Sequence, residues 1–243
     1  MEDLNCWQSK FKPCPYSDRL INKIELLNKH ANNKVDLIEV KKAIYYAKKY
    51  HAAQIRLSGE PYYIHPLIIT EMVADYIFKT EILVTSILHD TIEDTELTKG
   101  MIEYIFDLNI ANKVDDLTRN KNNQKISSAE ILKVLWYKKK YELLIVKQMD
   151  RLHNMQSIFV KEPIKIKKIV SETIEIFLIL SVHLGFNNVE SQLTKLCADY
   201  FPKLSLSDEF HRFLTAGENV QLLAPIFQNE VIHNHNLCLK EKI

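Results

Sequence analysis

The stretch SILHDTIEDTELT carries four ionisable side chains within six consecutive positions, namely His89, Asp90, Glu93 and Asp94. It overlaps the apolar run ILVTSIL, which is expected to be buried in a core. On a helix, residues four positions apart are neighbours, with Cβ atoms about 5–6 Å apart. We therefore expect His89 to lie beside Glu93, and Asp90 beside Asp94. The pattern predicts two acid/base pairs, one helical turn apart, at the end of a buried helix.

Further side chains in the sequence could complete a metal site around the adjacent His89 and Asp90, because two ligands alone do not make one. His65, which follows the SGEPYY loop at the start of a helix, is one candidate. The segment QMDRLHNMQS offers Asp150, His153 and Asn154, and the first and last of these lie on one helical face. Mixed imidazole and carboxylate ligation suits Mn, Fe, Co or Zn better than Ca.

The two remaining carboxylates are suited to proton transfer beside such a metal. A metal ion would lower the pKa of a water molecule bound to it and counter the charge that develops on a phosphoryl group. Glu93 and Asp94 would then orient the water and handle protons, a role that typically contributes about 10²–10⁴ in rate. The spacing therefore favours metal-assisted hydrolysis.

Each piece of this pattern also has an ordinary structural interpretation. A single His-Asp pair in a helix is mostly chance, and DTIED could be an acidic helix end that faces solvent. His65 before Pro66 could be simple loop packing, and Asp150 with Arg151 could be local structure in an ion-paired core helix. The joint occurrence of the three segments in one chain favours the metal site.

Composition limits the classes of protein to consider. The chain has 243 residues, 47% of them hydrophobic, which is ample for a sizeable core. Only 4 glycines and 7 prolines are present, which favours long helices over glycine-rich phosphate loops. With 32 basic and 31 acidic residues the formal net charge is +1, which argues against a protein that grips duplex nucleic acid by its phosphates.

Cysteine spacing and the apolar runs indicate the compartment. The four cysteines lie far apart with no C-x-x-C pair, which argues against a disulfide framework and favours a reducing cytosol. The N-terminal MEDLNCWQSKFKPCP lacks the basic-then-apolar order of a signal peptide. The longest apolar run, IFLILSV, is too short to span a bilayer. We expect a soluble, cytoplasmic protein that binds neither nucleic acid nor membranes.

Apolar residues recur at helical spacing almost throughout, which predicts an all-α protein. The polar segment 119–128 is predicted to be a mobile surface loop, and strands have little support. Side chains suited to capping, or prolines suited to a first turn, predict helix starts at or near Ser17, Asp36, Pro66, Thr80, Thr98, Pro163 and Asn187.

Three motifs, in chain order, resemble the hydrolase domain of the RelA/SpoT homologues. They are YAKKYHAAQIRLSGEPYYIHPLIIT, SILHDTIEDTELT and IVKQMDRLHNMQS, and the resemblance extends from about Val40 to Tyr200. It implies an HD-superfamily helical bundle that uses manganese (Mn²⁺) to remove the 3′-pyrophosphate from the alarmones ppGpp and pppGpp. The products would be GDP or GTP and pyrophosphate.

The resemblance also implies roles for individual residues. The implied metal ligands are His65, His89, Asp90 and Asp150. The implied catalytic pair is Glu93 and Asp94. The implied substrate contacts are Arg56, which would stack on the guanine, and Ser58, Asn154 and Ser157. Lys147 could help with phosphate charge, but we expect an exposed or ion-paired helix lysine there.

We expect three regions along the chain. Residues 1–35 would form an N-terminal helical segment, residues 36–200 the HD-type metal-dependent hydrolase domain, and residues 201–243 a C-terminal helical appendage or partly disordered tail. A short helix is expected at 207–214. Long members of the family continue into a synthetase domain, so we expect a stand-alone, hydrolase-only form, whose oligomeric state the sequence leaves open.

Leu57 is a departure from the family pattern, since many members carry a second basic residue there. This change could weaken phosphate contact or alter substrate preference, and it leaves two alternatives open. One is an HD-type phosphohydrolase that acts on another nucleotide, such as NADPH. The other is a non-catalytic regulator that binds the alarmone.

Overall fold

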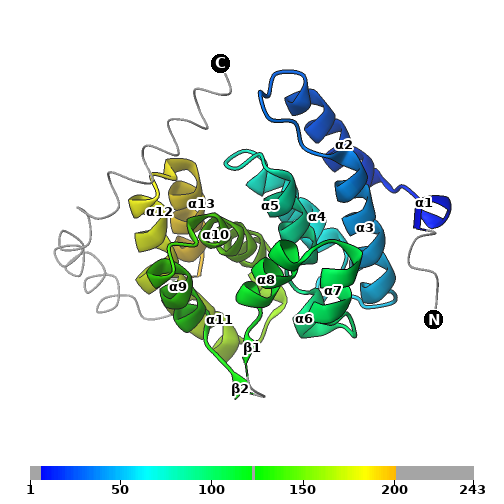
Figure 1. Ribbon diagram of the computed structural model, residues 1–243. Coiled ribbons are helices and arrows are strands. Elements are labelled where there is room, and N and C mark those ends of the chain that lie inside the picture. The colour runs from blue at the N-terminus through cyan, green and yellow to red at the C-terminus, as the bar shows by residue number, and fades with distance from the viewer. Residues whose placement is uncertain (1–6, 122–123, 201–243) are drawn as a thin grey trace. The chain divides into compact units, whose positions relative to one another are not determined.

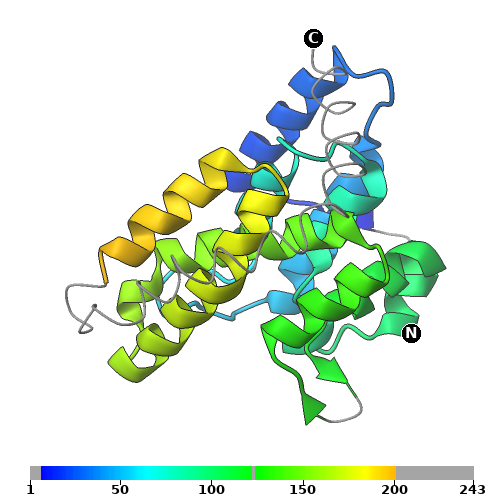
Figure 2. The ribbon, with the colours of Figure 1, turned by 90° about the vertical axis from the view of Figure 1, so that its left-hand side faces the viewer.

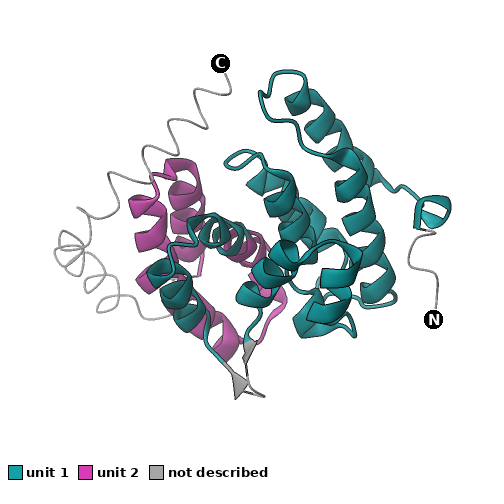
Figure 3. Ribbon diagram, viewed as in Figure 1, with its two compact units in different colours: residues 1–149, 241–243 teal, residues 150–240 magenta. Residues whose placement is uncertain are grey.

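The computed structural model describes residues 7–121 and 124–200, which fall into two compact units. One unit includes the described residues up to Met149, and the other begins at Asp150 (Figure 3). The boundary falls inside helix α10 (Tyr141–Gln156). The appendage or tail expected at 201–243, including the helix at 207–214, lies outside the described residues.

In the described part of the first unit, the regular structure is helical apart from one short hairpin and an isolated bridge between Ile55 and Pro61, so the all-α expectation is confirmed (Figure 1). The hairpin pairs β1 (Asn120–Lys121) with β2 (Gln124–Lys125). The helices of this unit that precede α10 are α1 (Trp7–Lys10), α2 (Pro15–Asn28), α3 (Leu37–His51), α4 (Ile64–Val73), α5 (Thr80–Leu88), α6 (Thr91–Asp94), α7 (Lys99–Ile105), α8 (Leu108–Leu117) and α9 (Ser128–Tyr137).

Helix α5 lies at the centre of the first unit, in contact with α3, α4 and α8 (Figure 1). Every residue from Ile82 to Leu88 is buried. A helix that is apolar on all sides belongs in an interior, and each fully buried aliphatic side chain contributes roughly 1.5–3 kcal/mol relative to exposure. The apolar run in the sequence therefore forms a firmly held central helix whose last residue precedes His89.

Two of the expected helix starts are confirmed by their capping hydrogen bonds. The Asp36 carboxylate accepts from the backbone N–H of Ile38 at 2.7 Å at the start of α3. The Thr98 hydroxyl accepts from the Met101 N–H at 3.3 Å at the start of α7. Both caps act over two or three positions, which is why the local sequence predicts them.

Two other expected caps are wrong. Helix α2 begins at Pro15 with Cys14 as its N-cap residue, so Ser17 lies inside the first turn, where its hydroxyl accepts from the Cys14 N–H at 2.7 Å. Thr80 is the first residue of α5 rather than its cap, and its hydroxyl accepts from the Asp36 N–H at 2.9 Å. In each case the hydroxyl forms a hydrogen bond other than the one expected.

The segment predicted as a surface loop contains more regular structure than expected. Besides β1 and β2, it holds the start of α9, which Ser127 caps. The Ser127 hydroxyl accepts from the Glu130 N–H at 3.2 Å, while the Glu130 carboxylate accepts from the Ser127 N–H at 2.8 Å. This reciprocal pair is a capping box, and its sequence pattern is S-x-x-E.

The described part of the second unit consists of the rest of α10 and five further helical elements. In Figure 2, α11, η2 and α12 follow one continuous helical path with α13 beside them, and α13 contacts η2 and α12. The π-helical η2 is the kind of irregularity that inserts one extra residue per turn. The elements are the 3-10 turn η1 (Ile158–Val160), α11 (Pro163–Glu172), η2 (Thr173–Leu178), α12 (Ile179–His183) and α13 (Asn187–Ala198).

An ion pair and a cation–π contact secure the part of α10 that belongs to the second unit. The Arg151 guanidinium pairs with Glu172 and lies 4.2 Å from the centre of the Phe177 ring. Cys197 of α13 is 1% exposed, and its burial raises the pKa of the thiol to about 12.

Among the described residues, no helix is long and apolar enough to cross a membrane.

Replacing Asp36 tests whether its cap stabilises α3. Asp36→Ala should lower the free energy of unfolding by about 1 kcal/mol, because the first-turn N–H groups lose their acceptor. Asp36→Asn keeps a side-chain oxygen and is the matched control. Urea denaturation of the three proteins makes the comparison, and equal stability of the alanine and asparagine variants would contradict it.

Candidate functional site

The acid/base cluster lies at a break between two helices rather than within one helix. Helix α5 ends at Leu88, His89 is its C-cap residue, and Asp90 is the N-cap residue of the four-residue helix α6. The expectation that His89 stacks above Glu93 on one continuous helix is therefore wrong. The Asp94 N–H donates to the Asp90 carbonyl at 2.9 Å, so the one-turn relation between these two aspartates holds.

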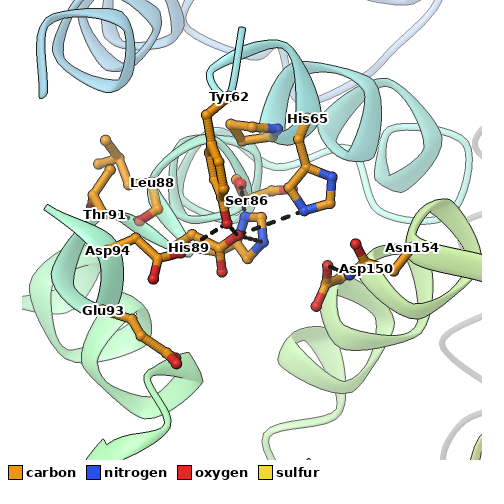
Figure 4. Close-up of polar contacts among 12 residues, drawn as sticks. Tyr62, His65, Ser86, Leu88, His89, Thr91, Glu93, Asp94, Asp150 and Asn154 are labelled. Carbon is orange, nitrogen blue, oxygen red and sulfur yellow. Dashed lines mark hydrogen bonds and ion pairs between the residues drawn. The ribbon is translucent and has the colours of Figure 1, made fainter. Parts of the chain in front are cut away.

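Two buried histidines converge on the Asp90 carboxylate. The Asp90 Oδ2 atom lies 3.1 Å from His89 Nε2 and 3.6 Å from His65 Nε2. His65 is 2% exposed and His89 is 1% exposed. Figure 4 shows both imidazoles turned toward this point, one from α4 and one from the end of α5. Two nitrogens and one carboxylate oxygen thus face a common position.

The hydrogen bond at His89 Nδ1 determines which of the two ring nitrogens carries the lone pair. His89 Nδ1 lies 2.8 Å from the Ser86 carbonyl oxygen. A carbonyl only accepts, so the neutral imidazole carries its hydrogen on Nδ1 and leaves Nε2 as the electron-pair donor. Metal-ligating histidines are typically oriented by this kind of backbone hydrogen bond, so the donor chemistry fits a metal ligand.

Asp150, the fourth expected metal ligand, lies on α10 at the start of the second unit. Asp150 directly follows the buried Met149 in α10 and accepts a hydrogen bond from the Asn154 amide at 2.6 Å. Imidazole nitrogens mixed with carboxylate oxygens suit a divalent transition metal.

The charge of Asp90 is maintained against the effect of burial. Burial acts to raise the pKa of the Asp90 carboxyl, but the positive charges of His89 and His65 in their protonated forms, and of Lys147, together outweigh it and hold the pKa well below its usual range. Lys147 is 7% exposed, so the exposed alternative for this lysine is wrong, while the ion-paired alternative stays a prediction. The carboxylate is therefore ionised and available as an anionic ligand.

Tyr62 and Gln54 hold Asp94, and neither residue was identified from the sequence. The Tyr62 hydroxyl lies 2.8 Å from Asp94 Oδ2 and 3.1 Å from Asp90 Oδ2 (Figure 4). The Gln54 amide donates to the Asp94 carbonyl oxygen at 2.7 Å. Burial and the charge of Asp90 raise the pKa of the Asp94 carboxyl above its ordinary value.

Glu93 is set apart from the imidazoles and anchored separately (Figure 4). Its Oε2 atom accepts a hydrogen bond from the Arg119 backbone N–H at 3.1 Å. Arg119 in turn exchanges hydrogen bonds with Ile126 across the base of the hairpin, because its carbonyl accepts from the Ile126 N–H at 2.9 Å and its Nε donates to the Ile126 carbonyl at 3.3 Å. Glu93 is thus fixed by the backbone of the β1–β2 hairpin rather than by α6 alone.

The expected substrate residues occur in both units, and their roles stay predictions. In the first unit, Arg56 lies in a turn closed by the Gly59 N–H at 2.9 Å from the Arg56 carbonyl, where the φ of +97° at Gly59 favours glycine. The Arg56 guanidinium pairs with Glu60 at 3.6 Å, and Ser58 is exposed. In the second unit, Asn154 contacts Asp150, and Ser157 is the N-cap residue of η1.

Two curated relatives match this chain over most of its length. A GTP pyrophosphokinase of Brucella ovis is 32% identical over 189 residues, which cover 74% of this chain and 25% of that protein. A guanosine-3′,5′-bis(diphosphate) 3′-pyrophosphohydrolase of Spiroplasma citri is 32% identical over 170 residues, 68% of this chain and 23% of that protein. The chain thus spans about a quarter of the length of these relatives. Their names confirm the expected resemblance to RelA/SpoT homologues.

Comparison with solved structures supports the fold. A structure described as a metazoan ortholog of SpoT that hydrolyses ppGpp matches with a TM-score of 0.56 and 17% identity, covering 72% of this chain and all of that chain. At this identity the likeness shows the fold alone. The family model described as HD domain matches residues 43–187, and this match shows that the chain belongs to the HD domain family.

Proposed function

We propose that this protein is a manganese-dependent hydrolase that removes the 3′-pyrophosphate from ppGpp and pppGpp. The observation that carries the proposal is the convergence of His65 Nε2 and His89 Nε2 on the Asp90 carboxylate beside the Asp94 carboxylate. The Spiroplasma citri relative, named as a 3′-pyrophosphohydrolase of guanosine bis(diphosphate), supports this choice of substrate.

The residues that would hold the ion are His65, His89, Asp90 and Asp150. They supply two imidazole nitrogens and two carboxylates, a mixed donor set that suits manganese among other divalent metals. When bound, such an ion lowers the pKa of a water molecule in the site and offsets negative charge on phosphoryl oxygens.

Glu93 and Asp94 would orient the attacking water and accept its proton. The water oxygen would form a bond to the phosphorus attached to the ribose 3′ oxygen, and the bond between that phosphorus and the 3′ oxygen would break. The 3′ oxygen would leave with a proton, giving GDP or GTP, and pyrophosphate would carry the oxygen from water. The raised pKa of Asp94 suits a group that takes up and returns a proton.

The residues that the resemblance implies as substrate contacts would hold the nucleotide. The planar, permanently charged guanidinium of Arg56 would stack on the guanine, and Ser58, Asn154 and Ser157 would contact the nucleotide. The ion pair with Glu60 orients Arg56 before any substrate binds. Leu57 is 75% exposed beside it, so the position that is basic in many family members presents an apolar side chain here.

The direct test of the proposal is pyrophosphate release from ppGpp by the purified protein, with manganese and with a chelator. Asp90→Asn should abolish stoichiometric manganese binding and reduce release by at least about 100-fold, because the amide lacks the anionic charge of the ligand. Asp75→Asn, which alters a carboxylate paired with Lys23 at 2.8 Å, is the control and should retain both. Full metal content and turnover in Asp90→Asn would contradict the assignment.

A second prediction separates catalysis from metal binding. The double variant Glu93→Gln and Asp94→Asn keeps oxygen acceptors for the Arg119 N–H and the Tyr62 hydroxyl but loses both negative charges. It should bind manganese like the native protein while kcat falls by about 10²–10⁴. Single-turnover assays on metal-loaded protein make the measurement, and near-native turnover would show that these carboxylates do not transfer the proton.

The same assays separate the proposed function from its alternatives. Metal-dependent phosphate release from NADPH, with none of pyrophosphate from ppGpp, would assign another nucleotide as the substrate. Saturable ppGpp binding without turnover in manganese-loaded protein would indicate a regulator instead of an enzyme.

A further inference from the structure

We infer that Tyr62 is a positioning residue that holds the Asp94 carboxylate in place for proton transfer. This inference rests on the proposed function for its kinetic part, while its structural part concerns the protein alone. The contacts that carry it all lie in the first unit. They join the loop after α3 to the short helix α6.

The Tyr62 hydroxyl connects a metal-ligand candidate to a proton-transfer candidate. It lies 2.8 Å from Asp94 Oδ2 and 3.1 Å from Asp90 Oδ2. A hydroxyl has one hydrogen, and an ionised carboxylate only accepts. The contact to Asp94 is the shorter of the two, so it is the one that the Tyr62 hydrogen serves.

The Tyr62 ring is itself fixed by its neighbours. It stacks on the His51 imidazole with centroids 4.6 Å apart and planes 21° apart, and it meets His65 edge-on at 6.0 Å. The Tyr62 backbone N–H donates to the Gln54 carbonyl at 2.9 Å. His51 is 1% exposed, so the Tyr62 ring packs against a buried side chain.

The same buried histidine supports a second tether to Asp94. His51 Nδ1 lies 2.8 Å from Gln54 Oε1, and Gln54 Nε2 donates to the Asp94 carbonyl. Because the Gln54 nitrogen faces Asp94, its oxygen faces His51, and His51 carries its hydrogen on Nδ1. Asp94 is thus held at the side chain by Tyr62 and at the backbone by Gln54.

These tethers matter because α6 has only four residues, from Thr91 to Asp94. So short a helix has little stability of its own, since the first turn fixes several dihedral angles for one hydrogen bond. Asp94 is only partly covered by its neighbours, and a side chain with that much access to solvent samples several rotamers unless a partner orders it. Misplacing a reacting group by about 1 Å can cost 10²-fold in rate.

Tyr62→Phe removes the hydroxyl and keeps the ring that stacks on His51, so it tests the inference without disturbing the core. The variant should bind manganese normally and show a KM for ppGpp close to the native value, while kcat falls by at least about tenfold. Tyr63→Phe is the matched control, because this neighbouring hydroxyl bonds Cys14 instead of a site carboxylate. It should leave kcat unchanged.

A double-mutant cycle asks whether Tyr62 acts through Asp94. In an Asp94→Asn background, Tyr62→Phe should cause little further loss of kcat, since the group that it positions no longer accepts the proton. Equal fold losses in both backgrounds would overturn the inference, because Tyr62 would then act independently of Asp94.

Hydrogen exchange of the metal-free protein provides a readout without substrate. Tyr62→Phe should speed exchange of the Asp94 and Thr95 amides roughly tenfold and leave the α5 amides unchanged. Native-like exchange at α6 would overturn the inference even if ppGpp is hydrolysed. Faster exchange in a protein that does not hydrolyse ppGpp would support the positioning role while the proposed substrate fails.

Discussion

The ionised Asp90 carboxylate, held in a poorly solvated position, is the constraint around which the site is arranged. Its side chain is 15% exposed, and burial of a charge in low-dielectric surroundings favours the neutral acid. Positive charge on His89, His65 and Lys147 lowers the pKa of the Asp90 carboxyl, so the charged form is favoured instead. A carboxyl that remained protonated would be a poor metal ligand, because ligands bind in their deprotonated form.

Rigid support for that charge comes from α5 and from the break that follows it. A helix that is buried from Ile82 to Leu88 fixes the position of His89, and the Ser86 carbonyl fixes the orientation of its ring. Asp90 then serves as the N-cap residue of α6, which presents Asp94 one turn further on. Precise sites are better built on such elements than on long loops.

Local features of this chain could be predicted from its sequence, whereas contacts between distant segments could not. The caps at Asp36 and Thr98 involve neighbours two or three positions away, so the residue types alone indicate them. Tyr62 is 32 positions from Asp94, and nothing in the periodicity of either segment shows that they meet. Likewise, the burial of Lys147 depends on how α10 packs, not on the residues beside it. The candidate metal ligands could be proposed from the sequence because three segments that carry histidine or aspartate side chains occur together in one chain.

Pulsed electron paramagnetic resonance of the manganese-loaded protein tests the central claim most directly, because it reports the nitrogen ligands of the ion itself. The account predicts hyperfine coupling to two histidine nitrogens, with His65→Gln and His89→Gln each removing one of them. A protein that binds manganese with no histidine nitrogen coupled to it would contradict the assignment of the site.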